Sequence, residues 1–104
     1  MKVIDQTLLI DGDFEGRAYG SEVTFIIVKT DEAGYGPALH RHPYTETFVI
    51  RSGEALFTVG EEEFVASGGQ ILVVPKLTPH KFRTLGAFES IDIHASDHFI
   101  TEWL

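Results

Sequence analysis

Short runs of β-branched and aromatic residues, separated by glycine-containing turns, recur along almost the whole chain. Runs of this kind at regular spacing are typical of antiparallel sheets. The expected strands cover residues 2–10, 19–30, 45–51, 55–59, 62–66, 71–74, 80–84 and 88–95. Gly60 and Glu61 are expected to form a two-residue hairpin loop. The pattern therefore predicts an all-β sandwich or closed barrel with almost no helix.

The last nine residues break this pattern. Their apolar side chains follow a helical spacing after a possible N-cap at Ser96 or Asp97. We therefore expect a short helix or tail at the C-terminus, with its apolar face covering either the barrel mouth or a partner subunit. The apolar residues concerned are Phe99, Ile100, Trp103 and Leu104.

The chain length of 104 residues predicts a single domain covering residues 1–104. A domain of this size buries a modest core, because small domains have a high ratio of surface to volume. A homodimer would bury additional surface, and we expect one.

The formal charge of −8 argues against a nucleic-acid partner and against binding to an anionic membrane surface. The absence of cysteine excludes disulfides, thiolate catalysis and iron–sulfur clusters. We see neither a signal peptide nor an apolar run long enough for a membrane span, so we expect a cytoplasmic protein.

Two histidines and a glutamate share one face of the chain. His40 and His42 are two residues apart, and Glu46 lies four residues further on, so all three project to the same side of an extended segment. Phe48 and Ile50 continue this inner face. His80 begins a later strand whose own inner face continues with apolar residues. If the two strands are neighbours, three imidazoles and one carboxylate converge, which suits a divalent transition metal and leaves coordination positions open.

Each of these residues also has a simpler interpretation. An isolated interior histidine is more often a hydrogen-bonded core residue, and a single glutamate is more often solvated. The combination favours a metal, because an ionised Glu46 beside Phe48 and Ile50 would cost several kcal/mol unless a cation offset it.

The segment from Gly34 to Gly53 resembles the first motif of the cupin family, GxxxxxHxHxxxExxxxxxG, at all of its fixed positions. The second cupin motif, GxxxxxPxGxxHxxxN, is matched by Gly69, Pro75 and His80. Leu77 stands at its second glycine and Thr84 at its terminal asparagine. These departures affect the expected turn at residues 76–77 but leave the histidine in place.

The resemblance implies a small antiparallel jelly-roll barrel, the double-stranded β-helix. It also implies that His40, His42, Glu46 and His80 bind one divalent transition metal ion. We favour Fe(II) or Mn(II), with zinc, nickel, cobalt or copper as alternatives. Small cupins are usually homodimers that exchange or pair N-terminal strands, which agrees with the expected dimer.

Four further aromatic residues are candidates for the pocket. Tyr44 can line its mouth as a hydrogen-bond donor and is the one catalytic candidate, although a loop-anchoring role is equally compatible with its position. Phe48, Phe57 and Phe82 are expected to fill the barrel beneath the metal as pocket-lining residues. His94 alternates with Ile91, Ile93 and Ala95, so we expect it to face the other side of the sheet.

The function predicted first is a metal-dependent enzyme acting on a small organic molecule. Dioxygenase chemistry is favoured over isomerase or lyase chemistry. The alternative is a module that binds or senses a sugar or another metabolite without catalysis, because fold and ligands do not determine the reaction. A third interpretation, in which the metal only stabilises the barrel, ranks last.

Overall fold

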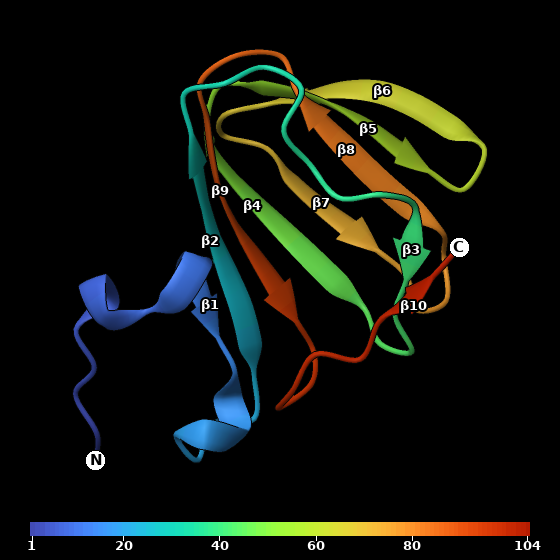
Figure 1. Ribbon diagram of the computed structural model, residues 1–104. Coiled ribbons are helices and arrows are strands. Elements are labelled where there is room, and N and C mark those ends of the chain that lie inside the picture. Colours follow the sequence, from blue (N-terminus) through green and yellow to red (C-terminus); the bar gives the residue numbers. More distant parts are fainter.

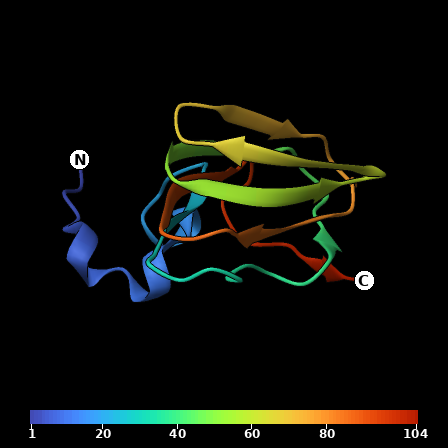
Figure 2. The same cartoon turned by 90° about the horizontal axis from the view of Figure 1, so that it is seen from above.

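Two five-stranded antiparallel sheets make up the protein in the computed structural model, which describes residues 1–104 (Figure 1). The first sheet has the order β1-β2-β9-β4-β7, with bounds Asp13–Phe14, Thr24–Thr30, Phe88–His94, Glu46–Ser52 and Ile71–Val74. The second has the order β10-β3-β8-β5-β6, with bounds Glu102–Trp103, His40–Arg41, His80–Thr84, Glu54–Val59 and Glu62–Ser67. Seen from above, the strands wrap around one interior (Figure 2). The predicted all-β jelly-roll barrel is confirmed.

The interior is built by strands whose side chains alternate between buried and partly exposed positions. On β4, Glu46, Phe48 and Ile50 are buried, as the sequence predicts. Phe48 packs edge-on against Phe57, with ring centroids 5.2 Å apart, and Phe57 stacks on Phe82 at 5.3 Å. These rings belong to one apolar cluster that fills the barrel next to the polar end of β4.

The predicted strand over residues 2–10 is wrong. The segment instead forms two 3₁₀ turns, η1 (Gln6–Leu8) and η2 (Ile10–Gly12), and none of their side chains is buried. Asp5 caps η1, since its carboxylate accepts a hydrogen bond from the backbone N–H of Thr7 at 3.0 Å. The next strand, expected from residue 19, begins only at Thr24, because η3 (Gly16–Ala18) and the turn that follows it come first.

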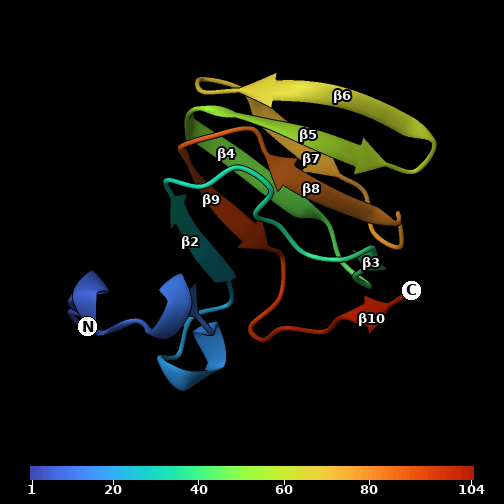
Figure 3. The same ribbon diagram turned by 45° about the horizontal axis from the view of Figure 1, so that its top comes forward.

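The predicted C-terminal helix is also wrong. Residues Glu102–Trp103 form β10, which pairs with β3 in the register Glu102↔Arg41 and Trp103↔His40. Figure 3 shows this last strand beside β3, next to the C-terminus. A backbone partner at a sheet edge overrides the local helical spacing, because pairing satisfies the edge strand's N–H and C=O groups. No helical segment of the structure has both the length and the apolar character needed to span a bilayer.

Two motif positions, one in each motif, lie at turns with positive φ. Gly53 has φ 80°, and a Cβ there would lie 2.0 Å from the carbonyl oxygen of Ala87, so only glycine fits. Leu77 has φ 64°, in the left-handed region that glycine would occupy without strain. The backbone at Leu77 therefore has the left-handed conformation expected for the glycine of the second motif. The Leu77 N–H donates a hydrogen bond to the carbonyl oxygen of His42 at 2.7 Å.

Candidate metal centre

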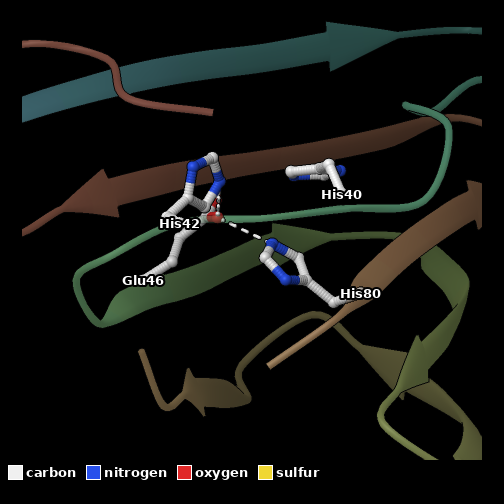
Figure 4. Close-up of side chains that lie close together, drawn as sticks. All are labelled: His40, His42, Glu46 and His80. Atoms are coloured by element: carbon white, nitrogen blue, oxygen red, sulfur yellow. Dashed lines mark hydrogen bonds and ion pairs between the residues drawn. The ribbon is translucent and has the colours of Figure 1, made fainter. Parts of the chain in front are cut away.

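The four predicted metal ligands come together between the two sheets. His40 lies on β3 and His80 begins β8; these two residues face each other in the register of the strand pair. Glu46 begins β4 on the opposite sheet, and His42 lies in the segment that joins β3 to β4. All four side chains are buried, and they point toward one another (Figure 4). The pairing of β3 with β8 is what brings His80, distant in sequence, to the other three.

The candidate ligand atoms of these residues all lie within 4.8 Å of one another. Nε2 of His42 and Nε2 of His80 are each 3.0 Å from Oε1 of Glu46. The rings of His40 and His80 have centroids 4.3 Å apart. One carboxylate oxygen thus lies between two imidazole nitrogens.

Backbone carbonyls determine which nitrogen of each imidazole faces the centre. Nδ1 of His40 lies 2.7 Å from the carbonyl oxygen of Ala38, and Nδ1 of His80 lies 2.8 Å from that of Thr78. Nδ1 of His42 lies 2.8 Å from the carbonyl oxygen of Ile100. A carbonyl only accepts, so each Nδ1 carries the proton and donates it. In a neutral imidazole this leaves the Nε2 lone pair directed at the cluster, which is the arrangement of metal-binding histidines.

An unsatisfied nitrogen shows that the cluster fits a cation. Nε2 of His42 is buried and has no hydrogen-bond partner, although Glu46 Oε1 is 3.0 Å away, because the angles do not suit a hydrogen bond. A lone pair that faces a carboxylate oxygen is repelled by it. A divalent ion between them would remove this repulsion and satisfy both groups. The donor set of three imidazoles and one carboxylate therefore fits a transition metal.

The electrostatics of the cluster favour the metal-binding protonation states of Glu46 and His40. Burial opposes ionisation of Glu46, but the neighbouring imidazoles outweigh this and hold its pKa well below the ordinary value. Burial lowers the pKa of His40. Burial also acts to lower the pKa of His80, but its contact with Glu46 reverses the sign and raises it. The carboxylate is thus ionised and His40 neutral near pH 7.

His94 belongs to this site, and the prediction that it faces the other side of the sheet is wrong. It is buried, and its Nε2 lies 3.3 Å from Oε2 of Glu46. The inward face of β9 carries Phe88, Ser90, Asp92 and His94, whereas the more apolar Ile91 and Ile93 are half-buried on the outer face. Taking the more apolar residues of β9 as its inward face therefore identifies the wrong side of this strand. Phe88, which shares the parity of His94, is the sequence signal that indicates the correct one.

Tyr44 contacts His94 and does not line the cavity described below. Its hydroxyl is 2.5 Å from Nδ1 of His94. Burial raises the pKa of Tyr44 to about 12, so the hydroxyl keeps its proton and can donate it to Nδ1. Nε2 of His94 then carries hydrogen and faces Glu46 Oε2. His94 therefore differs from His40 and His42, whose neutral rings present Nε2 lone pairs to the cluster.

A cavity of about 450 Å³ opens beside the cluster, within the size range of small-molecule sites. His40, His42 and Glu46 form part of its wall, and Phe48 and Phe82 contribute apolar surface. Phe57, also predicted to line the pocket, packs behind these two rings in the core. No lysine or arginine lines the cavity.

The C-terminal segment supports the cluster from outside. The carbonyl that holds His42 belongs to Ile100, and Thr101 and Trp103 line the cavity. Arg41 and Glu102 form a bidentate pair across β3 and β10, with two N–O distances of 2.9 Å. The sequence prediction of a covering function for this segment is thus compatible with the structure, although its conformation is a strand.

Deleting residues 99–104 should weaken metal binding by about 10- to 100-fold, the usual effect of losing an outer partner of a ligating histidine. The physical reason is that Nδ1 of His42 loses the Ile100 carbonyl. A competition titration of zinc against a chromophoric chelator measures the effect. Glu102→Gln is the control: it breaks only an exposed ion pair, worth about 0–1 kcal/mol, and should leave the affinity close to wild type. Equal affinities for the truncated and full-length proteins would contradict the expectation.

The comparisons with known proteins agree on the fold. A conserved protein of unknown function from Streptococcus pyogenes superposes with a TM-score of 0.65 at 24% identity, over 71% of this chain and 64% of its own. An uncharacterised protein with a double-stranded β-helix domain from Klebsiella pneumoniae gives 0.71 at 20% identity, over 79% and 70% of the two chains. Oxalate decarboxylase from Lactobacillus farciminis, solved with formate, gives 0.76 at 18%, over 88% of this chain and 30% of the enzyme.

These matches leave parts of the larger proteins uncovered, the decarboxylase above all, and at such identities they show a shared fold. No curated protein matches the chain in sequence. The family model for the cupin domain matches residues 26–94, which is well over half of the chain and includes all four candidate ligands. The chain therefore belongs to the cupin domain family.

Proposed function

We propose that this protein is a metal-dependent enzyme that acts on a small organic molecule. His40, His42, Glu46 and His80 are its proposed ligands, and Fe(II) or Mn(II) is the favoured ion. The observation that carries the proposal is the buried convergence of these four donors within 4.8 Å at the wall of a 450 Å³ cavity. A purely structural metal would not need a cavity of that size beside it.

The residues around the cluster have separate tasks in this proposal. The carbonyls of Ala38, Ile100 and Thr78 orient the three imidazoles. His94, held by Tyr44, lies beside the second oxygen of Glu46, with its Nε2 3.3 Å away. Tyr44 thus acts through His94. This contact supports a positioning role for Tyr44 and not the catalytic role expected from the sequence.

The cavity wall completes the site. Phe48 and Phe82 exclude water from one side of the bound molecule, which strengthens electrostatic interactions at the polar end. A divalent transition metal would supply Lewis acidity toward a substrate oxygen and, if it is Fe(II), electrons for reaction with O₂. We favour dioxygenase chemistry; binding or sensing of a metabolite without turnover is the alternative.

Metal content and oxygen consumption test the two parts of this proposal. Elemental analysis of the purified protein should find close to one divalent ion per chain. The Fe(II)-loaded protein, assayed in an oxygen electrode with diketones, thiols and catechols, should consume O₂ with at least one of them. Absence of a metal after exposure to Mn, Fe, Ni and Zn salts would overturn the metal site. Tight binding of a compound without O₂ consumption or product would instead favour the binding module.

We also propose that the protein forms homodimers and that it is a single domain located in the cytoplasm. Large apolar side chains stand exposed at both ends of the first sheet, which supports an additional buried interface. Those near the N-terminus are Met1, Val3, Leu8 and Ile10, and those on β7 are Ile71 and Val73.

A further inference from the structure

A buried carboxyl group that the candidate metal site does not use lies in the wall of the same cavity. Asp92 on β9 is 3% exposed and forms part of the cavity wall. It pairs with Phe48 on one side and with Ile26 on the other, between two strands of the first sheet. Glu46 pairs with His94, two residues away on β9. Asp92 is therefore one inward-facing position, about 7 Å along the strands, beyond the metal cluster.

Nothing in the protein compensates a charge on Asp92. The structure shows one hydrogen bond to its carboxyl group, donated by the Ser90 hydroxyl at 2.6 Å. A second carboxyl group, that of Asp13, also lines the cavity, and no lysine or arginine does. Burial, together with the nearby Glu46, outweighs the Ser90 contact and raises the pKa of Asp92 to about 8. A buried acid without a cationic partner is destabilising in its ionised form.

The cavity therefore has polar groups at two successive levels. The candidate metal ligands form one level, and the Asp92 carboxyl group lies at the next, level with Ile26 and Phe48. Val28 and Phe82 also line the cavity. An anionic group at this level would meet the Asp92 carboxyl group with no lysine or arginine to receive it, whereas a cation would favour the ionised form of Asp92.

We propose that the cavity binds a small organic amine whose ammonium group is held by Asp92 while its other end faces the metal ligands. The inference rests on the proposed function, because it takes the same cavity as the substrate site. With a pKa of about 8 the Asp92 carboxyl group keeps its proton in the empty cavity near pH 7. A bound ammonium ion would favour the carboxylate form and donate hydrogen bonds to it.

Three probes with the same carbon skeleton test the proposal: phenethylamine, 2-phenylethanol and phenylacetate. Their affinities for the zinc-loaded protein are measured by calorimetry or ligand-observed NMR. We expect phenethylamine to bind at least tenfold more tightly than either of the other two. In Asp92→Asn, which is nearly isosteric, this preference should disappear while the zinc content stays at the wild-type level. Glu63→Gln, an acid-to-amide change at an exposed position on β6, is the matched control and should keep the preference.

A measurement on the wild-type protein makes the test independent of how the variant folds. On addition of phenethylamine, the carboxyl ¹³C resonance of Asp92 should shift, whereas that of the exposed Asp31 should not. A zinc-loaded protein that shows no preference for the amine, or a preference that survives in Asp92→Asn, would overturn this inference alone. A wild-type protein that takes up no zinc would overturn the proposed function.

Discussion

Replacing His80 with alanine should reduce the affinity for a divalent metal by more than about a hundredfold, because loss of an outer-shell partner alone already costs about 10- to 100-fold. The change removes an Nε2 that lies 3.0 Å from Oε1 of Glu46 and whose ring is oriented by the Thr78 carbonyl. It also leaves Glu46 with one imidazole fewer beside its Oε1. Metal content by elemental analysis and affinity by chelator competition measure the effect, and turnover should disappear with the metal. The same result is expected for His40→Ala and His42→Ala.

A histidine outside the site provides the matched control for these variants. His98 lies in the C-terminal segment, where its Nδ1 contacts the neighbouring Asp97 at 2.6 Å. His98→Ala should retain full metal content and affinity. If all three cluster variants kept a full complement of metal, the assignment of the ligands would be wrong.

The candidate metal cluster could be predicted because its geometry is almost entirely local. His40, His42 and Glu46 lie close in sequence, and the alternation of an extended chain is enough to place them on one face. The predicted inward face of β4 is correct for the same reason, since Glu46, Phe48 and Ile50 are all buried. Only the partnership with His80 needed long-range information, and the motif resemblance supplied it.

His94 was placed on the wrong face because β9 is a central strand with both faces partly covered. The outer face of such a strand can be as apolar as the inner one, as Ile91 and Ile93 show. The inner face here is polar at Ser90, Asp92 and His94, where it adjoins the site. Hydrophobic alternation therefore fails where a strand supplies polar groups to a cavity.

The chain ends were mispredicted for a different reason. β10 exists because β3 offers an unpaired edge, and Arg41 and Glu102 hold the two strands together. Neither interaction can be read from the spacing of Phe99, Ile100, Trp103 and Leu104. At the other end, residues 2–10 have strand-like composition but no neighbouring strand to pair with, so the Asp5 cap and local turns prevail.

The free energy of unfolding of the wild-type protein should fall as the pH rises, and Asp92→Asn should abolish this fall. The pKa of Asp92 is raised from 3.8 to about 8 in the folded protein, chiefly by burial. Between these values the folded protein keeps a proton that the unfolded chain has lost, so the free energy of unfolding falls as pH increases. At about 1.4 kcal/mol per pKa unit, the loss is on the order of several kcal/mol and is complete above pH 8. Asparagine does not titrate and should not show it.

Chemical denaturation of the metal-free proteins at a series of pH values between 4 and 9 measures this effect. The other titrating groups near Asp92, namely Glu46, His94 and Asp13, are present in both proteins, so the difference between the two curves isolates Asp92. We expect wild type to lose stability relative to Asp92→Asn steadily up to pH 8, whereas Asp31→Asn, a change at an exposed position, should run parallel to wild type. Parallel curves for wild type and Asp92→Asn would mean that the carboxyl group is solvated or is neutralised by a partner within the protein. In either case the argument for a cationic ligand at Asp92 would also fail.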